Sequence, residues 1–496
     1  MDEATPPDSS TSHDGEFRTG WVSSGNDRGT LDILWACVIT TTLCCWVATH
    51  PNIGKHKSKW FEPFVDKVHL AVIGLLGPDL MFSIALGQLS SARRSVRKFG
   101  AETSGACSGR KWTLRHAFFA DMGGMFLASP DFPDGFPINA EQLHWLVKHG
   151  HLDFPDMDNM NIGERSASDT LSRIIAAWQA VWFSVIEIQR LRNGLPMSAL
   201  ELTTLSYVFV MLATQVCWIR KPSITRPETV TTKGNEAVSQ IRAWAKNNTH
   251  PDLVLEEWYR TPLDFLNGPR FLLEAHWFYY TRLAQMFWIP IGSRPVTSRP
   301  WDRVPSDSWI PIELSWVIAT SGGFVLMAFS GWFLLGWNLA FPTTAELWVW
   351  RGAAIYHAVF GVTISLYYLI ECMKWHAAAV RGGSGNVPTR YTLTVLELGD
   401  GADPESHIGW ASVSQGVCAR IWSRMSLLVD RVTNLSLDKD PTMRMPFGTL
   451  VLTTALTIGY VASRACFVID DLMSLRLQPS GVYITVNQYV PFWGGG

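Results

Sequence analysis

One long uncharged segment dominates the hydrophobic pattern of this chain. Residues 314–345 lie between Glu313 and Glu346 and contain no charged side chain. A helix of about 20 apolar residues spans the hydrocarbon core of a bilayer. The segment is long enough for one membrane span and the loop that follows it, so it predicts an integral membrane protein.

Further apolar segments recur along the chain, and polar or charged residues bound each of them. Together they predict an all-α fold, a polytopic transmembrane helical bundle with about seven spans. The third segment is the shortest and gives the weakest signal. The predicted spans are residues 33–49, 68–89, 174–186, 202–219, 314–337, 352–370 and 446–463.

The second segment is interrupted by Gly77, Pro78 and Asp79. A proline inside a helix removes one backbone hydrogen bond and kinks the helix. The interruption also places a carboxyl group in the middle of an apolar segment. Residues 68–89 therefore form either a kinked full span or a re-entrant helix.

The apolar segments divide the chain into regions of different character. The tail at 1–30 is polar and predicted to be disordered. A membrane region at 31–220 with about four spans and a polar insert at 90–170 follows, and then a hairpin of two spans at 313–375 and a last span with its tail at 444–496. Two long connections are predicted to be cytoplasmic, an aromatic- and proline-rich one at 221–312 and an insert at 376–443.

Two polar regions contain weaker structural signals. Residues 112–127 combine basic and apolar positions and predict an amphipathic helix that lies in the membrane interface. Residues 391–398 alternate in polarity like a strand.

The distribution of Lys and Arg predicts the orientation. The connection at 338–350 has neither residue, so it should face away from the cytoplasm. Counting spans backwards then places the N-terminus in the cytoplasm, in the endoplasmic reticulum or another endomembrane. Lys55, Lys57 and Lys59 would lie outside, against the rule. A re-entrant second segment would remove this conflict.

Composition narrows the classes of partner. The 41 basic and 43 acidic residues nearly balance, which argues against a nucleic-acid partner. The 24 tryptophans suit a chain whose partner is a lipid bilayer, because Trp prefers the membrane–water interface. The eight cysteines have no metal-binding CxxC spacing, so we expect small, buried free thiols and no disulfides.

Several short phrases, spread over almost the whole chain except residues 376–443, resemble a large family of uncharacterised fungal integral membrane proteins. The resemblance implies a fungal source and a shared membrane fold. It also implies a role in specialised metabolism, since some members occur near biosynthetic gene clusters for natural products. The phrases begin at Arg28-Gly29-Thr30, His50-Pro51-Asn52-Ile53, Asp134-Gly135-Phe136-Pro137, Gly194-Leu195-Pro196, Lys221-Pro222, Phe341-Pro342-Thr343 and Tyr460-Val461-Ala462-Ser463-Arg464.

This chain departs from the family pattern at two acidic positions. The family has Pro-Glu in the second segment, where this chain has Pro78-Asp79. The family also has a Glu near the end, where this chain has Asp470 and Asp471 after Arg464. The resemblance therefore does not transfer a role to these acids.

Ionisable residues inside predicted spans are the candidates for chemistry, because they are costly in a bilayer. Asp79 is the main catalytic candidate, since an apolar environment favours the neutral form of a carboxyl, which can donate a proton. A structural role in a hydrated kink is the alternative.

Glu201 is the second catalytic candidate. It follows Gly194-Leu195-Pro196, and the alternative is a first-turn acid favoured by the helix dipole.

Other ionisable residues have simpler interpretations. Glu187 and Arg190 are three residues apart and can pair on one helix face. His357 fits a hydrogen-bonded histidine inside the bundle. His116 and Asp121 have the wrong helical spacing for a catalytic pair.

No cofactor or metal site is predicted. The acidic stretch at Asp131, Asp134, Asp153, Asp156 and Asp158 lacks the DDxxD spacing of magnesium-binding prenyl-transfer enzymes, and a solvated loop explains it. Nucleotide-binding loops, HExxH and GxSxG are absent from the sequence.

Three functions fit these features. The first is a membrane-embedded cyclase or isomerase of a hydrophobic small molecule, which would use a buried acid and aromatic side chains that stabilise cations. The second is a transporter, although no internal repeat is visible. The third is a seven-span sensor or a scaffold without catalysis.

Overall fold

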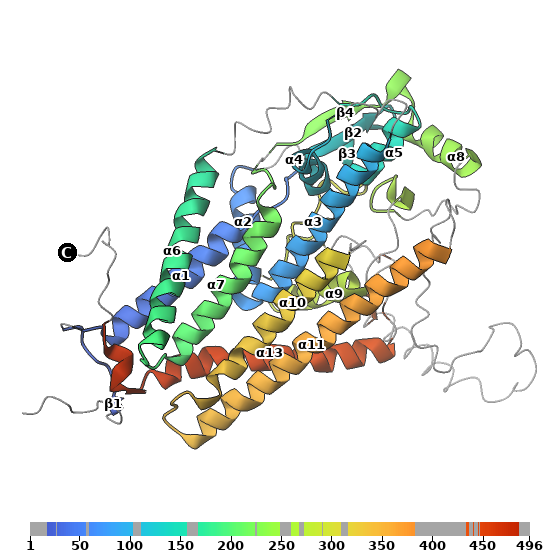
Figure 1. Cartoon of the computed structure of the whole chain (residues 1–496). Helices are drawn as coiled ribbons and strands as arrows, with labels where there is room; N and C mark the ends of the chain where they lie inside the picture. Colours follow the sequence, from blue (N-terminus) through green and yellow to red (C-terminus); the bar gives the residue numbers. More distant parts are fainter. Residues whose placement is uncertain are drawn as a thin grey trace, which may run out of the picture.

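The computed structural model describes most of the chain and shows a mostly helical protein (Figure 1). The tail at 1–16, the predicted strand at 391–398 and most of the insert at 376–443 lie outside the described residues. The described residues are 17–25, 27–55, 59–102, 111–155, 167–223, 226–248, 259–266, 272–289, 291–308, 316–381, 433–435, 440, 445 and 447–485.

Long helices cover the apolar segments that were predicted as spans. Of the helices described, five are long and apolar enough to cross a membrane, or six if one bent pair counts as a span, against about seven predicted. Helix α11 (Thr344–Arg381) covers residues 352–370 and packs along α10, but it is not among these candidates. The helices that cover the other predicted segments are α1 (Thr30–Ala48), α2 (Glu62–Leu76), α3 (Pro78–Ala101), α6 (Ala167–Arg192), α7 (Ala199–Trp218), α10 (Trp316–Trp332) and α13 (Phe447–Ser474).

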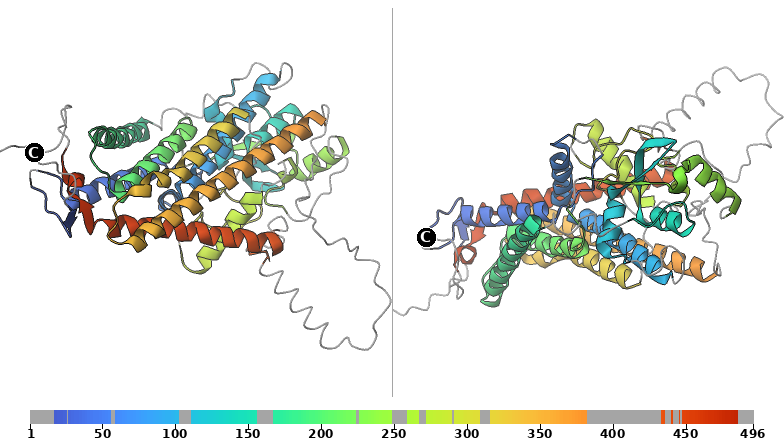
Figure 2. Two further views of the ribbon diagram at one scale, coloured as in Figure 1. Left: turned by 60° about the horizontal axis from the view of Figure 1, so that its bottom comes forward. Right: turned by 90° about the horizontal axis from the view of Figure 1, so that it is seen from above.

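Helix α7 lies inside the bundle, whereas α6 lies at its periphery (Figure 2). In α7, 67% of the apolar window is buried, against 22% in α6. Trp178, Val181 and Val185 of α6 are exposed. The weak signal of the third segment therefore belongs to a real apolar helix whose outward face suits lipid.

The predicted interruption at Gly77 and Pro78 is a break between α2 and α3, which are bent by 120°. Pro78 begins α3, where its missing N–H is not needed. A Cβ atom on Gly77 would lie 2.8 Å from Leu80 Cδ1 and 3.2 Å from the Tyr460 hydroxyl. Close packing at the break therefore favours glycine at this position.

The contacts of α2 and α3 show that the pair folds back on itself as a helical hairpin. Arg294 Nε donates to Asp66 Oδ1 of α2 (2.7 Å), and Lys221 Nζ donates to Gln88 Oε1 of α3 (2.9 Å). The loop at 305–306 contacts Asn52 and Gln88, so both helices reach the same end of the bundle. We call this end, which contains Lys221 and Arg294, the basic end.

The N-terminal segment lies at the opposite end, together with the connection before α11. Strand β1 (Phe17–Thr19) pairs antiparallel with β5 (Leu477–Pro479), and Arg476 pairs with Glu346. The sequence analysis predicted a cytoplasmic N-terminus and a non-cytoplasmic connection at 338–350. The structure places both segments at the same end of the bundle, so the two predictions cannot both hold. The hairpin removes one crossing from the count and brings Lys55 and Lys59, which follow α1, to the basic end.

The basic end contains a small mixed sheet, so the fold is mostly helical and not all-α. Strand β2 (Met125–Ser129) pairs antiparallel with β3 (Phe132–Ile138) and parallel with β4 (Glu228–Thr231). Helices α5 (Ala140–Lys148) and α8 (Val238–Asn248) lie beside this sheet (Figure 1). Helix α9 (Leu272–Met286) belongs to the connection before α10.

The predicted interfacial helix at 112–127 is wrong. The segment divides into the short helix α4 (Leu114–Phe119), a π-helical turn (Ala120–Gly124) and β2. Gly123 has a φ of 82°, which ends the helix, and Phe118 and Phe119 are buried. Its apolar residues pack inside the basic end and not on lipid.

The hairpin gives a testable topology. Cysteines introduced at Thr19 and Thr344 should label from one side of intact microsomes, and a cysteine at Lys246 should label from the other side. By the distribution of basic residues, the Lys246 side should be cytosolic. Labelling of Thr19 and Thr344 from opposite sides would contradict the fold.

Candidate functional site

Asp79 lies at the break between α2 and α3, inside the bundle. It occupies the first turn of α3, where the helix dipole favours an acid. The side chain is only 7% exposed, and its Oδ1 accepts a hydrogen bond from the Tyr460 hydroxyl of α13 (2.7 Å). The structure therefore joins the main candidate acid to a phenol from the last long helix.

Arg464 lies one helical turn after Tyr460 and binds the end of α2. Its Nε donates to the carbonyl oxygen of Leu76 (3.4 Å), and its Nη2 donates to the Tyr207 hydroxyl. Tyr207 in turn donates to the carbonyl oxygen of Leu75. Two side chains thus satisfy carbonyls that the broken helix leaves without helical partners.

Aromatic rings surround the Arg464 guanidinium. Its carbon lies 5.2 Å from the ring centre of Tyr207 and 5.7 Å from those of Phe329 and Phe333, within the range of a cation–π contact. His357 stacks on Tyr460 at 5.7 Å and 25°. Aromatic rings therefore surround a cation at this point, and that cation is one of the protein's own side chains.

Two buried nitrogen atoms beside Asp79 have no hydrogen-bond partner among the described residues. They are Arg464 Nη1 and His357 Nε2. His357 Nδ1 lies 3.3 Å from the carbonyl oxygen of Ser330, so the ring is held from its other side. Buried polar groups nearly always have partners, which makes this pair the place where a polar group of a ligand or a water fits.

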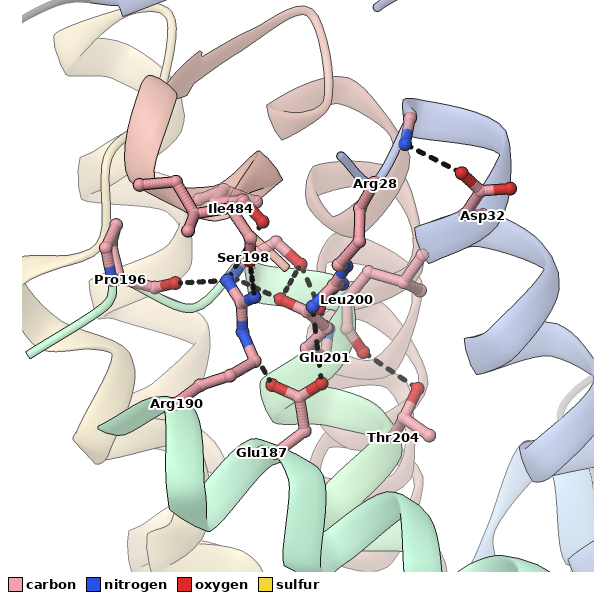
Figure 3. A network of polar contacts seen from close by, with 12 residues as sticks. Arg28, Asp32, Glu187, Arg190, Pro196, Ser198, Leu200, Glu201, Thr204 and Ile484 are labelled. Carbon is pink, nitrogen blue, oxygen red and sulfur yellow. Dashed lines mark hydrogen bonds and ion pairs between the residues drawn. The ribbon is translucent and has the colours of Figure 1, made fainter. Parts of the chain in front are cut away.

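The second candidate, Glu201, belongs to a separate polar cluster with Arg28, Glu187 and Arg190 (Figure 3). Its Oε2 accepts from the Ser198 backbone N–H (2.9 Å), and the Ser198 hydroxyl caps the Glu201 N–H. Arg28 pairs with Glu201 and lies 3.8 Å from Glu187. Glu201 thus lies in the first turn of α7 as the alternative interpretation expected, and its partners are structural.

Arg190 in the same cluster fixes the C-terminal segment (Figure 3). Its guanidinium donates to the carbonyl oxygens of Ile484 (2.7 Å) and Val482 (2.9 Å), and its Nε lies 3.5 Å from Glu187 Oε2. The predicted Glu187–Arg190 pair therefore exists, and it joins α6 to the segment after α13.

A third polar cluster lies at the basic end, around Lys221. The ammonium donates to the His50 carbonyl (2.8 Å), to Asn52 Oδ1 (2.9 Å) and to Gln88 Oε1 (2.9 Å), and the side chain is 1% exposed. Burial lowers the pKa of Lys221 to about 7. Lys221 joins the end of α7 to α3 and to the loop after α1.

His116 and Asp121 do not form a pair. Asp121 Oδ1 accepts the backbone N–H of Ala140 (3.0 Å), at the first residue of α5, and His116 lies beside Thr113 at the start of α4. Burial raises the pKa of Asp121 to about 6.

The acidic stretch provides no metal site in the part of the chain that the structure describes. Asp131 accepts the backbone N–H groups of Val238 and Ser239 (2.9 Å each), and so caps α8. Asp153 pairs with Lys233 (2.9 Å). Asp156 and Asp158 lie outside the described residues. Among those described, no group of three His, Cys, Asp or Glu side chains could hold a metal ion.

Sequence reasoning identified Asp79 but missed Tyr460, Arg464 and Tyr207 as its surroundings. The spacing of four between Tyr460 and Arg464 places both on one face of α13, and it lies within one of the phrases that carry the sequence resemblance described above. This spacing is the sequence signal that could have identified Tyr460 and Arg464 as neighbours on the buried face of α13. The described cysteines, Cys37, Cys44, Cys45, Cys217 and Cys466, are free thiols.

Comparison with known proteins supports a family of unknown function. Residues 5–249 match a family described as "Family of unknown function (DUF8562)". The match covers the N-terminal half, from the tail to the end of α8, and so includes Asp79, Tyr207 and Lys221. No curated protein and no solved structure matches the chain.

The buried Asp121 predicts a pH dependence of stability. Its folded-state pKa of about 6 lies above the unfolded value, so it contributes stability that is complete below about pH 4 and lost as the pH rises through 6. The contribution is about 3 kcal/mol at most. Asp121→Asn keeps an oxygen acceptor for the Ala140 N–H and cannot titrate.

The measurement is thermal unfolding of the detergent-solubilised protein between pH 4 and pH 7. The unfolding temperature of the wild type, relative to that of Asp121→Asn, should fall across this range. Parallel curves for the two proteins would show that Asp121 titrates normally.

Proposed function

We propose that this protein is a membrane-embedded acid–base catalyst, an isomerase or cyclase of a hydrophobic small molecule, with Asp79 as its proton donor. The observation that supports the proposal best is the buried Asp79–Tyr460 hydrogen bond at the break of a re-entrant helix. A positioned carboxyl inside an apolar bundle can deliver a proton where water does not compete.

Tyr460 and His357 extend the acid into a short relay. The phenol donates to Asp79 and stacks on His357, whose Nε2 has no partner among the described residues. An isomerisation removes a proton from one atom and returns one to another, so it needs neighbouring groups that exchange protons. Asp79 and Tyr460 are such a pair.

Arg464 favours one type of intermediate. The aromatic rings that would stabilise a carbocation already surround this guanidinium, and two like charges would repel there. Arg464 Nη1 has no partner among the described residues and can donate to oxygen. The site therefore suits a substrate that develops negative charge on oxygen, such as an enolate, better than one that passes through a carbocation.

The biological setting of the proposal comes from the resemblance to fungal membrane proteins. We place the protein in specialised metabolism, in the endoplasmic reticulum or another endomembrane, where a hydrophobic intermediate reaches the bundle through the bilayer. With the basic end in the cytosol, the N-terminus would face away from it.

A transporter is the second candidate, because discontinuous helices build the binding sites of many transporters. The break between α2 and α3 has this geometry. The buried face of α13 also presents a polar line at Tyr460, Arg464, Asp471 and Ser474, and Asp471 accepts from Thr203 of α7 (3.0 Å). Export would leave the product's skeleton unchanged.

Replacement of Asp79 tests the catalytic role. Asp79→Asn keeps an acceptor for Tyr460 but removes the titratable proton, so product formation should fall by roughly 10²–10⁴-fold at equal membrane abundance. Asp79→Glu should retain part of the activity. The measurement is metabolite profiling of a deletion strain complemented with each variant.

Asp32→Asn is the matched control, since Asp32 is an exposed acid in the first turn of α1. It should leave the product level unchanged. Wild-type product from Asp79→Asn would refute the catalytic role. Product that is made normally but retained inside cells would favour the transporter.

A further inference from the structure

A cavity of about 100 Å³ lies at the basic end, outside the catalytic candidate and independent of the proposed function. Residues of α9 and of the segment 293–307 line it, including Phe278, Arg282, Trp301 and Asp307. Arg294, which also lines it, binds Asp66 of α2. The cavity therefore lies between α9 and the outer end of the re-entrant hairpin.

The most buried charged residue that lines this cavity is Asp307, which is 1% exposed. Its Oδ2 accepts from Trp277 Nε1 (2.9 Å) and from the Ser293 backbone N–H (3.0 Å). Its Oδ1 has no hydrogen-bond partner among the described residues. A buried carboxylate oxygen without a partner indicates a missing N–H or O–H donor.

The arginines around Asp307 are not available to balance it. Arg260 is bound by Glu274 (3.1 Å) and Asp440 (3.0 Å). Arg294 is bound by Glu62 (3.4 Å) and Asp66 (2.7 Å). The inner part of the cavity therefore favours a cationic group that carries hydrogen-bond donors.

Arg282 differs from these two arginines. It is half-buried and has no ion-pair partner among the described residues. A cation in this position suits an anionic group near the mouth of the cavity.

Exposed aromatic side chains flank the helices whose residues line or border the cavity. Phe287 and Trp288 follow α9 directly and are 71% and 95% exposed. Trp60, just before α2, is 93% exposed. Exposed aromatic side chains at the end of a membrane bundle are typical of the headgroup layer.

From this order of groups we propose that the cavity binds the head of an aminophospholipid. The ammonium donates to Asp307 Oδ1, the phosphate pairs with Arg282, and the acyl chains lie along Phe287 and Trp288. A primary ammonium has N–H donors and fits a small cavity. The trimethylammonium of a phosphatidylcholine has no N–H and is bulkier.

The test uses the detergent-solubilised full chain with dihexanoyl-phosphatidylethanolamine and dihexanoyl-phosphatidylcholine as probes, and binding is measured by native mass spectrometry. The ethanolamine lipid should bind roughly tenfold more tightly, since a hydrogen bond to a charged group contributes at least that factor. Equal binding of the two lipids would overturn the proposal.

Two variants test which residue binds the ammonium and which binds the phosphate of the lipid headgroup. Asp307→Asn should abolish the preference between the lipids. Arg282→Gln should weaken both lipids, because both carry the phosphate, and should keep the preference. Arg220→Gln, at an exposed arginine of the same end, should change neither. An unchanged preference in Asp307→Asn would overturn the assignment.

Two further arms keep the test decisive. If Asp307→Asn is not recovered folded, the lipid preference of the wild type and the effect of Arg282→Gln test the proposal instead. Arg282 has no ion pair among the described residues, so its replacement should not disturb the fold. Phosphoethanolamine without acyl chains should bind far more weakly than the lipid. Equally tight binding would overturn the lipid assignment and identify a soluble ligand.

Discussion

The need to satisfy a broken helix inside an apolar bundle shapes the centre of this protein. Between α2 and α3 the chain bends by 120°, and the last carbonyls of α2 lose their helical partners. Within a bilayer, non-helical backbone is tolerated only where protein covers and bonds it. Arg464 and Tyr207 supply the donors, to the carbonyls of Leu76 and Leu75.

The side chains that bond these carbonyls bring further polar groups into the core. A buried guanidinium is costly without partners, and here it has a phenol, a carbonyl and three aromatic rings. Tyr460, one turn before Arg464, binds Asp79 at the start of α3. The candidate acid is thus part of the same arrangement that closes the helix break, which is why positioning and chemistry meet at one point.

The break itself could be predicted from the sequence, since Gly77 and Pro78 interrupt an otherwise apolar segment. The partner of Asp79 could not, because Tyr460 lies 381 residues later and only the folded bundle brings the two together. The apolar residues near 112–127 misled the prediction, since Phe118, Phe119 and Leu127 fit an interfacial helix as well as a buried turn and strand. The predicted separation of the N-terminus from residues 338–350 conflicts with the fold for a related reason: a hairpin that enters and leaves at one end has the composition of a span.

The most direct test of this account is a double-mutant cycle between Arg464 and Tyr207, measured as the stability of the solubilised protein. Arg464→Met and Tyr207→Phe should each destabilise the fold by about 1–3 kcal/mol, because each leaves a buried carbonyl without its donor. Arg464 also donates to Tyr207, so the double variant should lose less than the sum, with a coupling of about 0.5–3 kcal/mol. Additive losses would contradict the predicted coupling, and no loss from either variant would show that these two side chains do not hold the break.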